Sequence, residues 1–249
     1  MDPIDEQFFH AISSEKHIDT RVPALVKHYG IARLNAARDH RGLGILQHVI
    51  LDEIGDTERS HRLDVLLEAG LNPNVCDSGP DVAPVVMSPI IMAASKADMD
   101  GGVTIRQLLE HGADIHASES DGATVMHQAA QRGHPAALQI MLDYGASLDA
   151  VDHHGNTPLA LAVDVAGNME NTVFLLEQGA DPARAMQGRA WDFAVNSCRW
   201  SGDVRERVNL VRAAAAEQER QTLRQTAAEV EQAPEVVEQP APRRQRARL

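Results

Sequence analysis

The stretch that decides the fold is residues 121–163, DGATVMHQAAQRGHPAALQIMLDYGASLDAVDHHGNTPLALAV, which contains one pattern twice. Four positions of the first copy recur 33 residues later with the same or a similar residue. A fixed period of this size indicates an array of repeated structural units. The matching pairs are Gly122 and Gly155, Thr124 and Thr157, Met126 and Leu159, and Ala129 and Ala162.

Each copy carries signals for the start and end of helices. Thr157 precedes Pro158, and a Thr hydroxyl caps a helix whose first turn tolerates proline because the missing N–H had no partner there. Gly145 and Gly179 occupy positions where a helix ends in a left-handed residue. The Asp-x-x-Gly or Asp-Gly that follows predicts a tight turn projecting from the unit.

The apolar residues of a copy fall into two helices. Ala129-Ala130 and Ala160 to Ala162 keep the first helix thin, so that neighbouring units approach closely. Met141-Leu142 and Leu175-Leu176 form the buried face of the second helix. One such unit cannot bury its apolar face alone, so the copies stack into a solenoid.

The period and this order of residues resemble the ankyrin repeat. A third copy is visible in SPIIMAA (88–94) and RQLLEHGADIHA (106–117), VFLLEQGADP (173–182) closes the fourth clear unit, and earlier copies with poorly matching first helices end at 22–39 and 63–77. GRAWDFAV (188–195) is similar to a degenerate last copy. The resemblance implies an all-α solenoid of about five to six stacked helix-turn-helix units with a C-terminal capping helix.

The repeats divide the chain into consecutive parts. Val204, Val208 and Val211 form an apolar stripe at helical spacing that predicts a helix covering the last unit. Three prolines and little apolar material after residue 232 predict a disordered, Arg-rich tail. The expected parts are a repeat domain at 1–212 (weak repeat 4–39, repeats 40–77, 78–120, 121–151 and 152–182, degenerate cap 183–212), a solvent-extended helix at 213–232, and the tail at 233–249.

Composition and charge bound the function classes. The formal net charge is −13, and because 213–249 holds six acidic and six basic residues, the whole deficit lies on the repeats. An acidic solenoid repels nucleic-acid phosphates and favours basic partners, and the alternative is that the charge only keeps a solvated surface soluble. Only three of the 23 basic residues are Lys, a bias that favours a GC-rich, bacterial genome.

We expect a cytoplasmic protein. The longest apolar stretch, 83–94, is too short to span a membrane and is broken by Pro89, and the acidic N-terminus lacks the features of a signal peptide. Cys76 and Cys198 lie in units far apart, so a disulfide is not expected. Secretion by a route without an N-terminal signal stays open.

Two features predict a surface for a protein partner. The residue between the "H" and "AA" positions of each first helix points to the concave side in this family, and here that row carries no charge (His10, His48, Met92, Gln128, Leu161 and Phe193). An uncharged row would accept an apolar or helical segment, unless insertions and caps cover it. Extra residues at 52–62, 77–87, 96–104 and 164–170 lengthen the connections, where function concentrates.

The turn at 77–87 is more apolar than a solvated loop requires, which favours a contact with a partner. The alternative is that its valines fold back and pack on their own repeat. The predicted partner-binding residues are His48, Val82, Val85, Met92, Lys96, His116, Gln128, Arg132, His153, His154, Leu161 and Asp164.

Other chemistry finds little support. His127 and His134 occupy structural positions of the repeat, and DMDGG (98–102) lacks the Glu of a calcium loop, with Leu109 in its place. There is no Gly-x-Ser-x-Gly elbow and no phosphate-binding glycine loop with Lys. We therefore expect no cofactor, no metal site and no catalysis within the repeats.

Three function hypotheses remain. The first is a monomeric, non-catalytic scaffold for a basic partner or an apolar helix, as a bacterial effector or as an inhibitor or immunity protein. The second is a regulatory factor whose tail, with Arg243, Arg244, Arg246 and Arg248, contacts nucleic acid. The third is an enzyme in the first 60 residues, which would require a concave pocket lined by perturbed acids or histidines.

Overall fold

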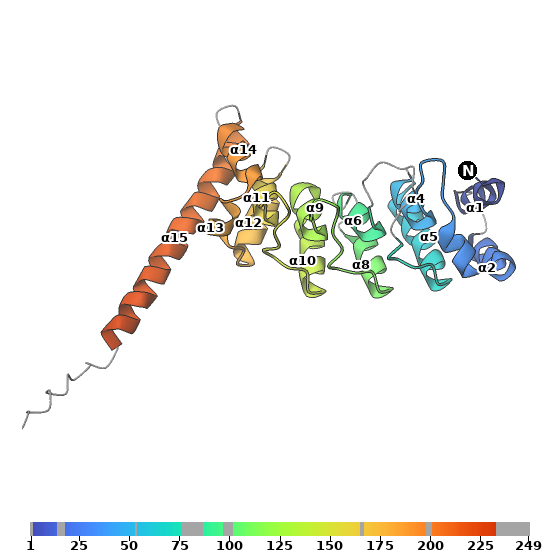
Figure 1. The fold of residues 1–249 in the computed structure, drawn as a ribbon, viewed down its shortest axis with the longest axis horizontal. Helices are drawn as coiled ribbons and strands as arrows, with labels where there is room; N and C mark the ends of the chain where they lie inside the picture. The colour runs from blue at the N-terminus through green and yellow to red at the C-terminus, as the bar shows by residue number, and fades with distance from the viewer. Residues whose placement is uncertain are drawn as a thin grey trace, which may run out of the picture.

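The computed structural model describes residues 2–13, 18–52, 54–75, 87–96, 102–164, 167–197 and 201–232. These residues form an elongated row of helix pairs, and a long last helix leads away from the end of the row (Figure 1). Apart from one isolated bridge between Ser118 and Thr124, the described residues contain no strand pairing. The predicted all-α solenoid is confirmed.

Consecutive helices pair into units along the row (Figure 1). In the first unit, α3 follows the pair, and a single-turn helix, α13, lies between the fifth and sixth units. The bounds are α1 Pro3–Ser13, α2 Ile18–Tyr29 and α3 Ile31–Ala36; α4 Ile45–Leu51 and α5 Asp56–Glu68; α6 Pro89–Ala94 and α8 Val103–Glu110; α9 Val125–Arg132 and α10 Pro135–Asp143; α11 Pro158–Val163 and α12 Met169–Glu177; α13 Pro182–Ala185; α14 Arg189–Ser197 and α15 Gly202–Gln232.

The units stack as two layers of helices. In one layer α4 contacts α6, α6 contacts α9, α9 contacts α11, and α11 contacts α14. In the other layer α2, α5, α8, α10, α12 and α15 contact one another in that order. A single apolar cluster runs through all units from Phe8 to Val211. This continuity explains why no unit is an independent domain.

The local signals act as expected. Thr157 caps α11, because its Oγ1 accepts a hydrogen bond from the Ala160 N–H at 3.3 Å. Gly145 and Gly179 have φ angles of 87° and 89°, the left-handed conformation in which a helix commonly ends. Ala129 is fully buried, which lets α9 approach α11 closely.

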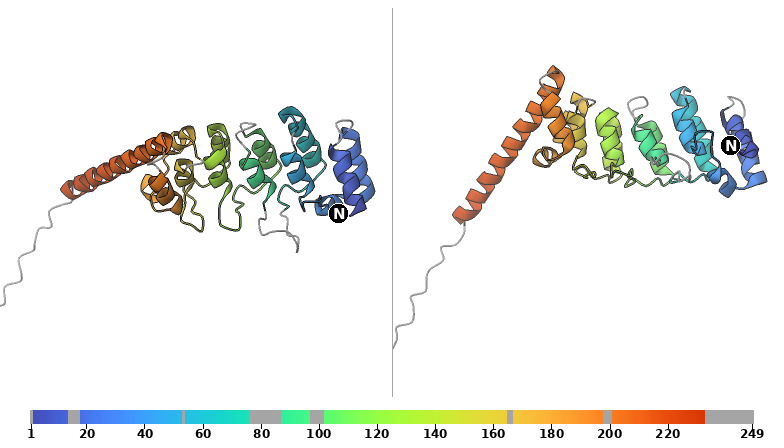
Figure 2. Two further views of the ribbon diagram at one scale, coloured as in Figure 1. Left: turned by 90° about the horizontal axis from the view of Figure 1, so that it is seen from above. Right: turned by 45° about the horizontal axis from the view of Figure 1, so that its top comes forward.

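The turns between units repeat one geometry, an acid followed three residues later by glycine. The acids are Asp39, Glu119 and Asp152, and each donates its N–H to the carbonyl four residues ahead at 2.9–3.0 Å. The glycine N–H donates back to the carbonyl of the acid in each turn. These connections lie along one edge of the stack in both views of Figure 2.

Buried polar side chains connect neighbouring units. His127 is fully buried, and its Nε2 lies 3.0 Å from the carbonyl oxygen of Asn156 in the next turn. Gln47 occupies the same place in an earlier unit and donates from Nε2 to the Val75 carbonyl at 2.9 Å. The expectation of a structural role for His127 is confirmed.

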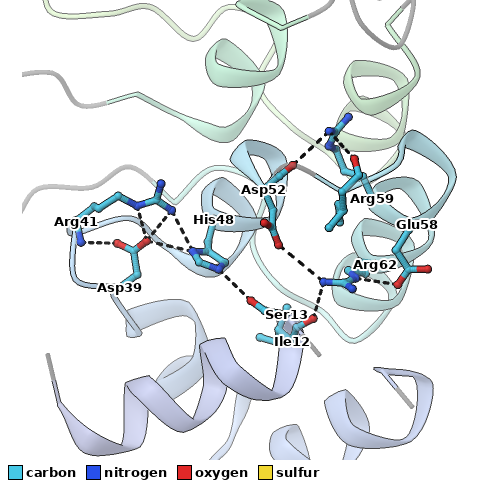
Figure 3. A network of polar contacts seen from close by, with 10 residues as sticks. Ile12, Ser13, Asp39, Arg41, His48, Asp52, Glu58, Arg59 and Arg62 are labelled. Atoms are coloured by element: carbon cyan, nitrogen blue, oxygen red, sulfur yellow. Dashed lines mark hydrogen bonds and ion pairs between the residues drawn. The ribbon is translucent and has the colours of Figure 1, made fainter. Parts of the chain in front are cut away.

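Two buried arginines of α5 make polar contacts near the first unit, and the contact of Arg62 with Ile12 joins the first two units (Figure 3). The Arg62 side chain donates from Nε to Glu58 at 2.9 Å and from Nη1 to the Ile12 carbonyl at 3.0 Å. Arg59 donates to the carbonyls of Asp52 and Ile54, where the chain enters α5. The expected insertion at 52–62 is therefore wrong over 56–62, because that segment is the start of α5 and its arginines are buried.

The last helix both covers the stack and extends beyond it. Val204, Val208 and Val211 are at most 1 % exposed, as the apolar stripe predicts. Arg207 is also buried and donates to the carbonyls of Val163 and Asp164 at the end of α11. The cap and the expected extended helix at 213–232 form one continuous helix, α15, which projects from the row (Figure 1). None of the described helices is apolar enough over a sufficient length to cross a membrane.

Candidate partner-binding surface

The uncharged row of the first helices is accessible at some positions and buried at one. His48, Gln128 and Leu161 are half-buried, and Phe193 is 59 % exposed. Met92 is only 4 % exposed, because every residue of α6 is buried where this short helix packs against α4, α8 and α9. The prediction that Met92 offers its side chain to a partner is therefore wrong in this structure.

The row meets the turns through side-chain hydrogen bonds. His48 Nδ1 lies 3.1 Å from Asp39 Oδ2, and Gln128 donates from Nε2 to Glu119 Oε1 at 2.6 Å. Both contacts join a row residue to the acid of the preceding turn. The helix row and the turns therefore form one continuous surface rather than two separate ones.

The two turn acids differ in their electrostatics. Burial of the Asp39 carboxylate raises its pKa, but hydrogen bonds from the Leu43 N–H, His48 and Arg41 outweigh burial and hold the pKa below its ordinary value. Burial and the charge of Asp121 raise the pKa of Glu119, and the hydrogen bond from Gln128 only partly opposes them. The Asp39 carboxylate is thus stabilised, whereas the Glu119 carboxylate is compensated only in part, by Gln128.

The contacts of His48 bear on the hypothesis of an enzyme in the first 60 residues (Figure 3). Ser13 Oγ lies 3.1 Å from His48 Nε2, so that Ser13, His48 and Asp39 follow the order of a nucleophile, a base and an orienting acid. However, Arg41 Nη2 lies 3.2 Å from the same His48 Nδ1 that faces Asp39, which competes with a relay through that nitrogen.

The position of Ser13 also disfavours a nucleophile. Ser13 is the last residue of α1, where helix carbonyls concentrate partial negative charge that destabilises an alkoxide. The cavity beside this region, between Leu34 and Val75, holds about 10 Å³ and is lined by neither His48 nor Asp39. We interpret the contacts as a polar tie between α1 and α4.

The predicted turn residues are exposed and held by their backbones. The His116 N–H donates to Asp114 Oδ1, the His153 N–H to the Asp121 carbonyl, and the His154 N–H to Asp152 Oδ1. The backbone at these three histidines is therefore held in place, and their side chains are exposed. His153 also packs over Gly122, where an added Cβ would lie 2.9 Å from its ring.

The other predicted residues flank the helix ends. Arg132 is exposed at the end of α9, and Lys96 is half-buried just after α6. Asp164 is half-buried after α11, and its carbonyl accepts from Arg207 at 2.9 Å. Val82, Val85 and the turn at 77–87 up to residue 86 lie outside the described residues, as do both cysteines and the Arg-rich tail.

Histidine side chains within the stack form hydrogen bonds with backbone groups. His134 Nδ1 accepts a hydrogen bond from the Ala136 N–H at the start of α10, which confirms its structural role. Within the described ranges, no three His, Cys, Asp or Glu side chains gather as metal ligands would.

The acids of the turns, Asp39, Glu119 and Asp152, were not among the residues predicted to form the surface. Their signal was visible, since an acid stands three residues before glycine in DHRG (39–42), ESDG (119–122) and DHHG (152–155). The pattern predicts the turn but not which carboxylate its backbone uses, a difference that depends on side-chain length at Glu119.

Comparison with known proteins agrees with this architecture. The model of the family "Ankyrin repeats (3 copies)" matches residues 90–185. The chain is 32 % identical over 133 residues to human SH3 and multiple ankyrin repeat domains protein 1, a match covering 53 % of this chain and 6 % of that protein. It is 27 % identical over 177 residues to human SH3 and multiple ankyrin repeat domains protein 2, covering 71 % of this chain and 8 % of the relative.

A plant protein is also similar. The E3 ubiquitin-protein ligase KEG of Arabidopsis thaliana is 30 % identical over 110 residues, which is 44 % of this chain and 6 % of the ligase. The chain thus matches only a small part of each of these relatives. The stacked helix pairs, the repeated turns and the family match together show that residues 90–185 of this chain are ankyrin repeats.

Proposed function

We propose that the chain is a non-catalytic scaffold that binds a protein partner through its helix row and its turns. Ankyrin repeats are generally modules of protein–protein interaction, which supports this function. The observation that carries the proposal is the contact between row and turns at Gln128 and Glu119, which makes one surface with exposed side chains at His116, Arg132, His153 and His154.

The partner should present basic or apolar groups. The repeats carry the whole formal charge of −13, so a basic partner gains from charge complementarity and associates faster at low ionic strength. Phe193 is 59 % exposed in the row and offers an apolar anchor, and aromatic anchors often dominate binding energy. A monomeric, cytoplasmic effector or inhibitor that covers a basic surface of its target fits these properties.

Affinity capture from an extract of the source cells, followed by mass spectrometry, tests the scaffold function. A double variant, Phe193→Ala with Leu161→Lys, should lose a partner that the wild type retains, because it removes an apolar anchor and places a positive charge opposite the basic groups of the partner. Tyr144→Ala is the matched control, because Tyr144 is 40 % exposed but follows α10 in the other helix layer. If the wild type and both variants capture the same partner equally well, the binding surface does not lie on the row. If the wild type captures no partner, the result argues against a scaffold.

The alternative of a factor that contacts nucleic acid through residues 240–249 has a separate test. Affinity for a mixed-sequence RNA or DNA should then fall steeply with salt and disappear when these residues are deleted.

A further inference from the structure

A depression between the second and third units borders the surface described above at Glu119. It has a volume of about 400 Å³ and opens beside the turn that precedes α9. Two carboxylates, three hydroxyls and an amide line it, with only Ala117 apolar. The lining residues are Asn74, Ser88, Asp114, Ala117, Ser118, Glu119 and Ser120.

Glu119 faces this depression because it is one methylene longer than the acid of the two similar turns. Asp39 and Asp152 each use Oδ1 to accept two backbone N–H groups of their own turn. In the turn at 119–122, Asp121 Oδ1 accepts one of the two corresponding groups, the Ala123 N–H, at 3.0 Å. The Glu119 carboxylate is thereby released from the turn and accepts instead from the Gln128 amide.

The negative charge at this place is uncompensated by the basic residues around it. In the part of the chain that the structure describes, Lys and Arg form no ion pair with Asp114, Glu119 or Asp121. Burial and the charge of Asp121 raise the pKa of Glu119, which shows the cost of leaving this carboxylate uncompensated. A bound cation would remove that cost.

Ser88 supplies an independent sign of a missing ligand. Ser88 is among the residues that line the depression, it is only 4 % exposed, and its buried Oγ has no hydrogen-bond partner among the described residues. Buried hydroxyls in folded proteins almost always have a partner. The Asn74 amide is already engaged, because its Oδ1 accepts from the Asp114 N–H and its Nδ2 donates to the Gly112 carbonyl.

We propose that this depression is the anchor site for an arginine side chain of the protein partner. Its lining residues include two acids, and a guanidinium carries five donors and a permanent charge in a planar arrangement that suits carboxylates, on an apolar stem that packs against carbon atoms. The site rests on the proposed scaffold function and names the chemistry of the partner. Asp114 and Glu119 hold the charge, and the serine hydroxyls accept the remaining N–H groups.

A peptide titration followed by NMR tests the site in the full chain. The probe is the blocked pentapeptide Ac-Gly-Ala-Arg-Ala-Gly-NH₂, and two companions replace Arg with Lys or with citrulline, its neutral analogue. We expect saturable shifts of the Ser88, Ser118, Glu119 and Ser120 amides with the Arg peptide, weaker shifts with Lys and none with citrulline. Equal binding of the citrulline peptide, or of the Lys peptide, would overturn the assignment.

Three variants sharpen the test. Glu119→Gln removes the charge, and Glu119→Asp keeps the charge but returns the carboxylate toward the turn, so each should weaken the Arg peptide by about tenfold or more. Asp143→Asn is the control, since it makes the same charge change at the end of α10, in the other helix layer. Binding that Glu119→Asp and Asp143→Asn leave equally strong would reject the proposed site.

Extract capture and the peptide titration together distinguish a failure of the anchor site from a failure of the scaffold function. If extract capture retains a partner while the Arg peptide causes no shift, the anchor site is wrong and the scaffold function stands. If the peptide binds as described but no partner is captured, the site is real and the scaffold function loses its support.

Discussion

At the scale of single residues, His127 and Gln47 make the same kind of contact with different side chains. Each reaches a backbone carbonyl of the next turn, His127 at 3.0 Å and Gln47 at 2.9 Å. Burial lowers the pKa of His127, and the Asn156 carbonyl and the charge of Asp152 only partly oppose it. His127 is therefore neutral in the fold, and its Nδ1 accepts from the Thr124 N–H.

A neutral buried histidine makes stability depend on pH. Its unfolded pKa is about 6.5 and its folded pKa is lower, so the unfolded state binds more protons and the free energy of unfolding falls as the pH drops below about 6.5. His127→Gln, which copies the residue type of Gln47, should reduce this fall. Urea unfolding of both proteins at about pH 7.5 and 5.5 measures the difference. Parallel pH profiles would contradict it, since the other eleven of the 12 histidines are common to both proteins.

Substitutions of Arg62 distinguish the contribution of packing to the free energy of unfolding from the contribution of charge. The side chain is fully buried, but its acidic partners Glu58 and Asp52 are 40 % and 33 % exposed. Removing Arg62 leaves these acids hydrated and orphans mainly the Ile12 carbonyl. We expect Arg62→Ala to cost about 3 kcal/mol, since it creates a cavity as well, and Arg62→Met to cost about 1–2 kcal/mol. Urea unfolding measures both, and equal losses would show that the ion pairs dominate.

At the scale of elements, α15 combines a buried half and an exposed half. Val208 is 1 % exposed against the last unit, whereas residues 221–226 are exposed. Val208→Asp buries an unpaired carboxylate and should cost about 3 kcal/mol or more. Ending the chain after Gln221 should leave the midpoint of thermal unfolding within about 2 °C of the full chain. A large loss on truncation would mean that the projecting half packs on the stack.

Elements with strong periodicity are predictable, and the exceptions have physical causes. The helices around Thr124, Thr157 and Val204 follow their caps and apolar stripes, so the sequence predicts them. The start of α5 resembles an insertion because Arg59 and Arg62 have side chains typical of the surface, although here both are buried and donate to carbonyls and acids. The burial of Met92 escapes prediction because three neighbouring helices cover a row position in a six-residue helix.

The candidate site is predictable only in outline. The sequence predicts that turns and row carry the surface, and the row residue Gln128 does contact the turn acid there. It does not reveal the depression. There the Ala123 N–H donates to Asp121, whereas the equivalent N–H groups of the other turns donate to the first acid of the turn. This difference depends on one methylene and is visible only in three dimensions.

At the scale of the whole molecule, stability should vary along the stack. A unit in the middle has two neighbours and a unit at the end has one, so the end units open at lower free energy. In this chain α1 and α2 lie at one end and hold to the second unit through Arg62 and the Ser13–His48 contact. The middle units α6 to α11 share apolar contacts on both sides.

Amide hydrogen exchange followed by mass spectrometry should show this gradient. We expect the amides of α9 and α11 to exchange most slowly, and those of α1, α2 and α15 beyond residue 221 to exchange first. Arg62→Ala should accelerate exchange in α1 and α2 by about tenfold or more while leaving α11 unchanged, because coupling passes only between neighbouring units. Acceleration of the same size in α11 would instead show that the stack opens as one cooperative body, in which the N-terminal polar contacts stabilise every unit.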